Sequence, residues 1–419
     1  MGLDPMVVKL ATSGRPAGSR KPSWLNRNVI GMSVTSFFSD AGHEMVTAVL
    51  PGFLGTIGVA AGALGWIEGI SDAASSFAKL GAGWYSDRIG HRKGLVTLGY
   101  FLTGAALALF ALAVAWPLIL AGRLVSWLGR GIRGPLRDAM LSDSVDPESR
   151  GKAFGLHRAG DTIGAVVGPL IGVALLSWLP AGAPSASFRV IFVLSLLPGL
   201  AAVAAFILLV RETGRPARQA LRFWGALRGL PKPYTHFLFG VGLFGTGDFA
   251  PTLLILAATR MLTPAHGAVR AAEIAGLLYV LRNVFYAGVS FPVGAIADRM
   301  SKQKLLAMGY FLGAVTALGT AALFSFSITS LGLIALVFAL SGIYIAMEDA
   351  LEGAIPADLV ASAERGTAYG LMGTVNGIGD LVASALVGSV GTAVSPVPAF
   401  GCAGILMLAG AALVVKNRG

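Results

Sequence analysis

The stretch GWYSDRIGHRK, residues 83–93, is the most informative part of the sequence because a second stretch repeats its pattern. GAIADRMSKQK, residues 294–304, places the same aspartate–arginine pair at the same position, and it begins 211 residues later. At the same offset RDAML (137–141) is matched by EDALE (348–352). Similar stretches in the same order predict that the chain consists of two related halves.

The composition indicates a protein that crosses the membrane many times. Of its 419 residues, 55% are hydrophobic and only 13% are charged, whereas a soluble domain has about 25% charged residues. A membrane span needs about 20 mostly apolar residues. The sequence offers twelve such segments: 28–57, 61–85, 94–116, 117–142, 152–178, 188–210, 235–259, 273–297, 305–326, 331–356, 366–390 and 397–415.

The basic residues predict the orientation. They gather in the N-terminal tail, the C-terminus and the loops on one side, while the opposite loops contain only Arg260 and Arg270. Cytoplasmic loops of membrane proteins are enriched in Lys and Arg, so both ends of the chain are expected in the cytoplasm. The expected location of the protein is the inner membrane of the cell. The net charge of +11 then reflects topology and contact with anionic lipid, and it does not indicate nucleic-acid binding.

These observations predict an all-α membrane protein with twelve transmembrane helices in two pseudo-symmetric six-helix bundles. The expected division is a cytoplasmic tail (1–27), an N-terminal bundle (28–210), a cytoplasmic linker (211–234), a C-terminal bundle (235–415) and a short C-terminus (416–419). Repeats of this kind build transporters whose site lies between the halves near the bilayer midplane.

The repeated loop resembles the signature loop of the major facilitator superfamily. The resemblance rests on Gly83, Asp87, Arg88, Gly90, Arg92 and Lys93, and the degenerate second copy keeps Asp298 and Arg299. It implies the major facilitator fold, a central cavity lined by spans one, four, seven and ten, and a monomer. The sequence contains no motif for nucleotide hydrolysis, and no cofactor is expected. Transport is therefore expected to be driven by a gradient of protons or of another cation.

Span five contains a second resemblance. Gly164, Gly168, Pro169 and Gly172 are similar to the antiporter motif of drug/proton exporters in this superfamily. In that group the Gly-Pro pair bends helix five and seals the halves together, so the resemblance implies export. Val173 stands where a final glycine is usual, and a Gly/Pro kink in an ordinary packed helix is the alternative.

Ionisable residues inside the spans mark the expected transport pathway because they are costly in a bilayer. In span one, Asp40, His43 and Glu44 share one helical face. A carboxyl group in a low-dielectric cavity can hold a proton near neutral pH, so Asp40 or Glu44 is the expected proton carrier. The alternative is structural pairing, for example of Glu68 with Lys79. The full set of expected substrate- and proton-binding residues is Asp40, His43, Glu44, Thr47, Glu68, Asp72, Arg123, Arg130, Asp248 and Arg282.

Charged residues near the cytoplasmic side are expected to form the gate together with the signature loop. Arg137 and Glu348 occupy equivalent positions in the two halves with opposite charge, which suggests that they pair across the gate. The expected gate residues outside the loop are Arg137, Asp138, Arg158, Asp161, Glu348 and Asp349.

Three functions remain open from the sequence, and none of them is enzymatic. The first is proton-coupled efflux of a small cationic or zwitterionic organic compound. The second is export of a divalent metal ion or metal chelate, with Asp40, His43, Glu44 and Asp248 as ligands, since oxygen and imidazole donors suit such metals. The third is proton-coupled uptake of a solute, which uses the same fold and similar acids.

Overall fold

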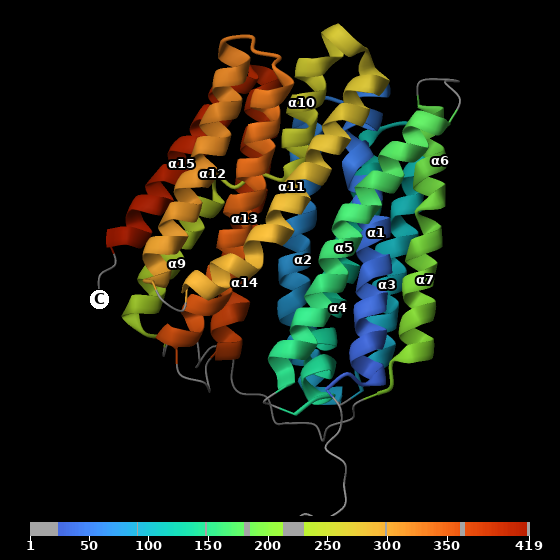
Figure 1. Cartoon of the computed structure of the whole chain (residues 1–419), viewed down its shortest axis with the longest axis vertical. Helices are drawn as coiled ribbons and strands as arrows, with labels where there is room; N and C mark the ends of the chain where they lie inside the picture. The colour runs from blue at the N-terminus through green and yellow to red at the C-terminus, as the bar shows by residue number, and fades with distance from the viewer. Residues whose placement is uncertain are drawn as a thin grey trace, which may run out of the picture.

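A computed structural model describes residues 24–89, 91–146, 149–179, 185–212, 230–297, 300–360 and 365–416. In these residues the regular structure is entirely helical (Figure 1). The helices of the first half are α1 (Arg27–Thr56), α2 (Ala61–Ile89), α3 (Lys93–Ala108) with the 3₁₀ turn η1 (Leu109–Leu112), α4 (Trp116–Asp143), α5 (Arg150–Trp178), α6 (Ala186–Leu194) and α7 (Leu196–Leu209). Those of the second half are α9 (Lys232–Gly245), α10 (Pro251–His266), α11 (Ala268–Ala297), α12 (Lys302–Ser325), α13 (Leu331–Leu359), α14 (Arg365–Ala393) and α15 (Pro396–Lys416).

Each of the twelve expected spans corresponds to helix, and two of them are broken. The sixth divides at Ser195 into α6 and α7, and the seventh is interrupted between Gly245 and Pro251. Pro251 has no backbone N–H to continue a helix, so α10 starts afresh at this residue. Among the described residues, eight helical segments are long and apolar enough to cross a membrane. The charged helices α1, α2 and α4 are not among them.

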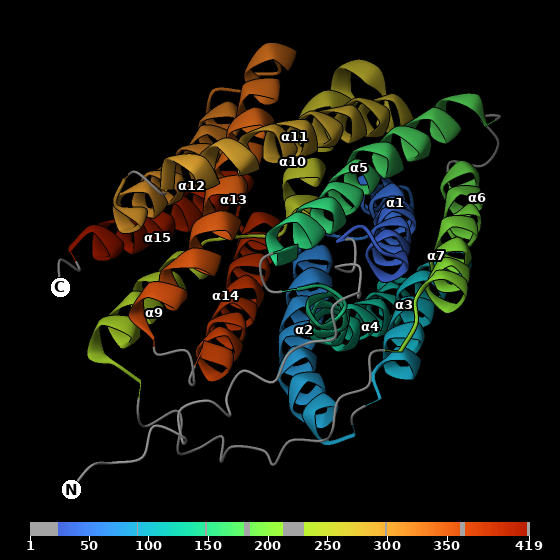
Figure 2. The same cartoon turned by 60° about the horizontal axis from the view of Figure 1, so that its bottom comes forward.

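The predicted repeat is visible in which helices pack together. In the first half α1 packs on α5, α2 on α4 and α3 on α4. In the second half α9 packs on α14, α11 on α13 and α12 on α13, which are the equivalent pairs. Figure 2 shows the two groups side by side, the first in blue to green and the second in yellow to red.

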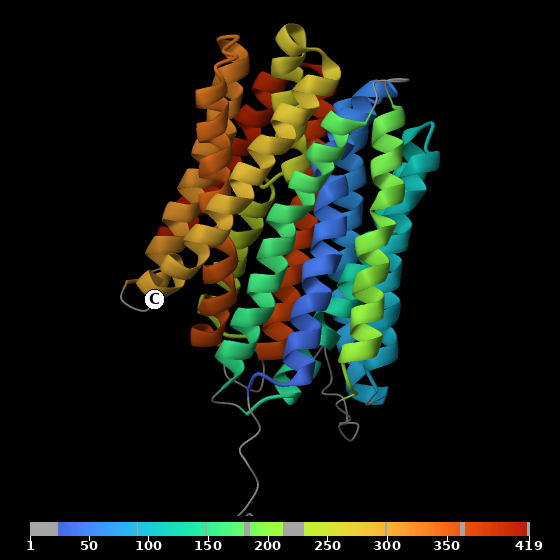
Figure 3. The same cartoon turned by 45° about the vertical axis from the view of Figure 1, so that its right-hand side comes forward.

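The long helices run between two ends of the molecule (Figure 3). We call the end with the connections after residues 89, 143, 209, 297 and 359 the linker end, and the opposite end the hairpin end. At the hairpin end the halves are in contact, because α1 packs on both α10 and α11. A Cβ atom at Gly52 would lie 2.6 Å from Cβ of Ala272, which shows how closely α1 approaches α11. No comparable packing joins α4 to α13 within the described residues.

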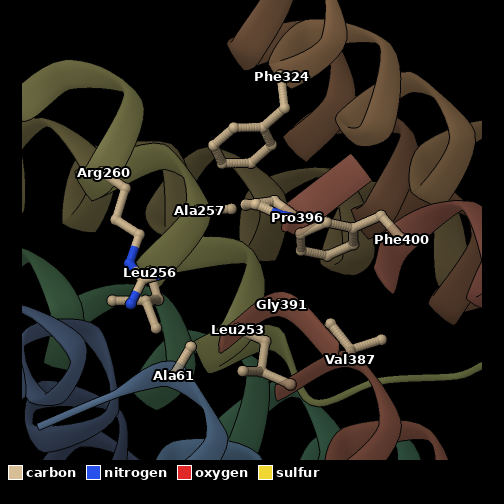
Figure 4. Close-up of a pocket in the computed structure, with 10 residues that line it drawn as sticks. All are labelled: Ala61, Leu253, Leu256, Ala257, Arg260, Phe324, Val387, Gly391, Pro396 and Phe400. Atoms are coloured by element: carbon tan, nitrogen blue, oxygen red, sulfur yellow. The ribbon is translucent and has the colours of Figure 1, made fainter. Parts of the chain in front are cut away.

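A small apolar pocket lies within the hairpin end (Figure 4). Ala61 of α2 forms one wall, and Arg260 of α10 contributes the charged group in its lining. The remaining lining residues are Leu253, Leu256, Ala257, Phe324, Val387, Gly391, Pro396 and Phe400. The lining of this pocket is therefore mainly apolar.

The glycines of span five hold α1 against α5. A Cβ atom would lie 2.5 Å from the carbonyl oxygen of Phe37 at Gly164, and 2.3 Å from that of Ala41 at Gly168. At Gly172 it would lie 2.8 Å from the carbonyl oxygen of Met45. The resemblance implied a seal between the halves, but this glycine face packs within the first half. It fixes the backbone of α1, which carries Asp40, His43 and Glu44.

Candidate functional site

The three ionisable residues of α1 lie in different surroundings. Asp40 Oδ1 lies 3.6 Å from Nη2 of Arg130 and 3.7 Å from Nη2 of Arg133, both on α4. The His43 ring packs on Trp127 of α4, with 5.2 Å between ring centroids. Glu44 instead accepts a 2.7 Å hydrogen bond from the Tyr279 hydroxyl of α11 in the other half.

The metal hypothesis finds no geometric support in this arrangement. Asp40 and Glu44 have partners on different helices, and Asp248 lies against Tyr344 of α13. No group of three His, Cys, Asp or Glu side chains within the described part of the chain could hold a metal ion.

A buried ion pair joins α2 to α4. The Arg123 guanidinium donates to Oε2 of Glu68 from Nη2 at 2.9 Å and from Nε at 3.1 Å, and both side chains are only 2% exposed. Arg123 Nη1 also donates to the Thr47 hydroxyl of α1 at 3.3 Å. Glu68 therefore has Arg123 as its partner, and the suggested pairing with Lys79 is not formed. Asp72, one turn further along α2, is half-buried.

Trp127 lies between two arginines of α4. Arg123 stands 5.4 Å from its ring centroid and Arg130 stands 4.9 Å from it, distances at which a cation is attracted to an indole face. Arg130 pairs loosely with Asp40, and its Nη1 atom has no hydrogen-bond partner among the described residues. The first half thus offers a cationic group beside an aromatic ring.

The second half contains a group of acids, which we call the C-half acid cluster: Asp248, Glu348, Glu352 and Asp380. Asp248 lies in the break between α9 and α10 and accepts a 2.9 Å hydrogen bond from the Tyr344 hydroxyl. Glu352 accepts from the Tyr310 hydroxyl and, at 2.7 Å, from the Asn376 amide. Every donor named here is neutral.

Arginine is positioned near these acids without forming a salt bridge with them. Arg282 of α11 donates to the Ser341 hydroxyl at 3.0 Å and to the Asn283 side chain at 3.3 Å. Within the described residues, no basic side chain lies within salt-bridge distance of the cluster. In the first half, by contrast, Asp40 and Glu68 both face arginine.

Comparison with known proteins identifies the family. Residues 32–272 and 252–418 match the family described as the Major Facilitator Superfamily. This chain belongs to that superfamily. It is therefore a multi-pass membrane transporter and not an enzyme.

The relatives and solved structures agree with this assignment. An uncharacterized MFS-type transporter of Methanocaldococcus jannaschii is 31% identical over 388 residues, covering 91% of this chain and 93% of the relative. A multidrug resistance protein of Cronobacter sakazakii is 35% identical over 127 residues, covering 30% of this chain and 31% of the relative. The crystal structure of a bacterial homolog of the human lysosomal transporter Spinster, inward-facing and unoccupied, has a TM-score of 0.71 at 17% identity, with 93% and 94% of the two chains covered.

Arg137, one of the expected gate residues of this major facilitator chain, has its partners within the first half. Arg137 donates to its neighbour Asp138 at 2.9 Å and to the Ser36 hydroxyl of α1 at 3.3 Å. Glu348 is 8% exposed and lies beside Asp248, so the structure does not bring Arg137 and Glu348 together.

Asp161 of α5 lies close to two bases of its own helix. Its Oδ2 is 3.6 Å from His157 Nε2 and 3.8 Å from Arg158 Nη1. Across the halves, Asp349 of α13 is an electrostatic neighbour of Arg158, and it accepts a 2.8 Å hydrogen bond from the Tyr286 hydroxyl of α11. Among the expected gate residues, Arg158 and Asp349 are thus a pair of opposite charge on the two halves.

The signature loop is anchored within the first half. Arg92 Nη1 pairs with Asp143 at the end of α4 at 3.0 Å. The backbone N–H groups of Arg92 and Lys93 donate to the Glu212 carboxylate at 3.1 and 2.9 Å. Gly83, Asp87 and Arg88 fall in the last turns of α2, while Gly90, Asp298 and Arg299 lie outside the described residues.

Reasoning from charge alone missed the neutral groups around the buried charges. Trp127 stands between Arg123 and Arg130 on α4, so its position beside two cations carried a spacing signal. Tyr279, Tyr310, Tyr344 and Asn376 carried no such signal, because each meets its acid only through the packing of separate elements.

Proposed function

We propose that this transporter exports a small cationic or zwitterionic organic compound in exchange for protons. The observation that supports this proposal is how the two halves compensate their most buried acids. Among the described residues, Asp40 and Glu68 of the first half lie within 4 Å of an arginine, whereas no base lies that close to Glu348 or Glu352 of the second half. Buried acids without basic partners require a proton or a cation, since an isolated buried charge is costly.

A zwitterionic cargo would use both halves. Its cationic group would lie at the C-half acid cluster. Its anionic group would meet Arg130, whose Nη1 lacks a partner and whose side chain is 24% exposed. A planar or aromatic cargo would also gain contact with Trp127, which carries an unpartnered Nε1.

The direction rests on topology and on resemblance. Arg27, Arg92, Lys93, Lys152 and Lys302 lie at the linker end, so we place this end and both termini on the cytoplasmic side of the inner membrane. The glycines of α5 resemble the antiporter motif, and the similarity to the Cronobacter multidrug resistance protein covers part of the chain. Both features favour export.

Everted membrane vesicles with an acidified interior and a pH-sensitive dye test the proposal. We expect lipophilic organic cations such as tetraphenylphosphonium to restore dye fluorescence in vesicles that contain the transporter. We expect recovery to fall at least tenfold in Asp248→Asn and to persist in Asp358→Asn, an acid at the linker end of α13 that pairs with Lys302.

Three other outcomes would contradict the proposal in different ways. Recovery with divalent iron, nickel, cobalt or manganese alone would assign metal export. Faster uptake of a solute by whole cells expressing the chain, without recovery in everted vesicles, would assign import. Absence of any recovery and any uptake would remove the proton as the coupling ion.

A further inference from the structure

Glu348 of α13 is the member of the C-half acid cluster that none of the named donors compensates. It is 8% exposed, and its Oε2 atom has no hydrogen-bond partner among the described residues. Burying an ionised carboxylate in this way is expensive unless a donor, a base or a cation compensates it.

Comparison with similar acids shows that Glu348 is distinct. In the described part of the chain, Asp40, Glu68 and Asp161 also have a buried oxygen without a donor. Each of these three lies within 4 Å of an arginine nitrogen, so a cation compensates its charge. Glu348 has no such base within 4 Å among the residues that the structure describes, and its principal electrostatic neighbours are all acids: Asp248, Glu352, Asp349 and Asp380.

The elements packed around Glu348 bring one carboxyl group, that of Asp248, into hydrogen-bonding contact with it. On α12 and α14, Tyr310 and Asn376 donate to Glu352. On α11, Arg282 is held by Ser341 and Asn283. In the break between α9 and α10, Asp248 lies within hydrogen-bonding reach of Glu348. A carboxylate only accepts hydrogen bonds, so two carboxyl groups bond to each other only when they share a proton.

We propose that Asp248 and Glu348 hold the coupling proton between them and that the cationic group of the cargo displaces it. This inference rests on the proposed function and names the site of coupling within it. With the proton, the two carboxyl groups carry one negative charge. When a monovalent cation enters, the proton leaves to water, and two carboxylates plus the cation again carry one negative charge. The exchange is one cation for one proton.

The position of Asp248 suits this exchange. It lies in the non-helical segment between Gly245 and Pro251, and interrupted helices build ion sites in transporters. Tyr344 donates to Asp248 Oδ1 from a position one turn before Glu348 on α13, so both groups that meet Asp248 are held by one helix. The charge of Asp40, by contrast, is already compensated by Arg130 and Arg133.

Infrared spectroscopy of the purified full-length chain tests the shared proton without any cargo. We expect a carbonyl band of a protonated carboxyl group near neutral pH that disappears on alkaline titration. The band should be absent in Glu348→Gln and present in Asp358→Asn, the control on the same helix. Size-exclusion chromatography checks that each variant is folded. If Glu348→Gln does not fold, Glu348→Asp should shift the band and keep one proton.

Tetraphenylphosphonium and the vesicle assay separate this inference from the proposed function. Addition of the cation to the purified chain should reduce the band, and Glu348→Gln should bind the cation with an affinity that no longer changes with pH. A band unchanged in Glu348→Gln or in Glu348→Asp would overturn the inference. If the band depends on Glu348 but wild-type vesicles show no exchange of cations for protons, the shared proton stands and the proposed function is wrong.

Discussion

At the scale of single residues, the chain satisfies its buried charges in two different ways. Glu68 is compensated by the full charge of Arg123 on the neighbouring helix. Glu352 is instead compensated by the neutral donors Tyr310 and Asn376. An ion pair keeps both groups charged, whereas neutral donors allow an acid to gain or lose a proton. The two kinds of site should respond differently to mutation.

Glu68→Gln should destabilise the protein strongly because it leaves the Arg123 charge buried and unpaired. We expect a loss of about 3–5 kcal/mol in the free energy of unfolding. Thermal unfolding in detergent measures this loss of stability. Asp358→Asn is the matched control, because Asp358 pairs with Lys302 and its own side chain is more than half exposed. That control should cost under about 1 kcal/mol. A double variant, Glu68→Gln with Arg123→Gln, should regain part of the loss, and a single variant as stable as wild type would refute the pair.

Asp40→Asn should destabilise the protein more than Asp72→Asn. Asp40 is the carboxylate beside Arg130 and Arg133, and two nitrogen atoms of Arg133 already lack a hydrogen-bond partner within the described part of the chain. Asp72 has no base within salt-bridge distance among the described residues. We expect a difference of about 2 kcal/mol, because removal of one partner exposes the desolvation cost of the other. Equal melting temperatures for the two variants would show that the arginines do not depend on Asp40.

At the scale of elements, glycine determines how closely the helices approach. Along α5 the glycines at 160, 164, 168 and 172 recur every four residues, and each faces a backbone carbonyl of α1. Small residues allow membrane helices to pack at short range, where no hydrophobic driving force is available. Asp40 is carried by α1, so its position relative to α4 depends on this uncharged glycine face of α5.

Gly168→Ala should weaken this packing, since the new Cβ would lie 2.3 Å from the Ala41 carbonyl oxygen. Overpacking of this kind costs about 1–3 kcal/mol. Thermal unfolding of the purified variant measures the effect. Gly155→Ala is the control on the same helix, because nothing lies within 4 Å of a Cβ atom at that position. If both variants unfold at the same temperature, the close approach of α1 and α5 is not required for stability.

At the scale of the whole molecule, the two halves meet along α2 and α14. A Cβ atom at Gly65 would lie 2.1 Å from the carbonyl oxygen of Ser384, and one at Gly377 would lie 2.3 Å from the Ser76 hydroxyl. Alternating access requires the halves to rock against each other around such contacts. Glycines let α2 and α14 approach closely along this boundary, whereas no comparable packing joins α4 to α13 among the described residues.

Gly65→Ala should shift the balance between conformations. A cost of about 1–3 kcal/mol in the state with α2 on α14 changes the population ratio by roughly tenfold or more. Spin labels at Lys152→Cys and Lys304→Cys, in a background without Cys402, would report the distance between the halves at the linker end. We expect a changed distance distribution in Gly65→Ala and the wild-type distribution in Gly373→Ala, where a Cβ atom meets open space. An unchanged distribution in Gly65→Ala would show that the contact does not set the conformation.

The sequence by itself determined the spans, the repeat and the family, because apolar length and repeated motifs are local properties of the chain. It also identified the buried ionisable residues as a set, since a charged residue inside an apolar segment can be recognised from the sequence. Only the tertiary structure decided their partners. Glu68 meets Arg123 and not Lys79, Glu44 meets Tyr279, and Glu348 lies beside Asp248 and not Arg137. The physical reason is that helical spacing fixes which residues share a face, but the rotation of each helix and the choice of neighbours come from packing across the whole molecule.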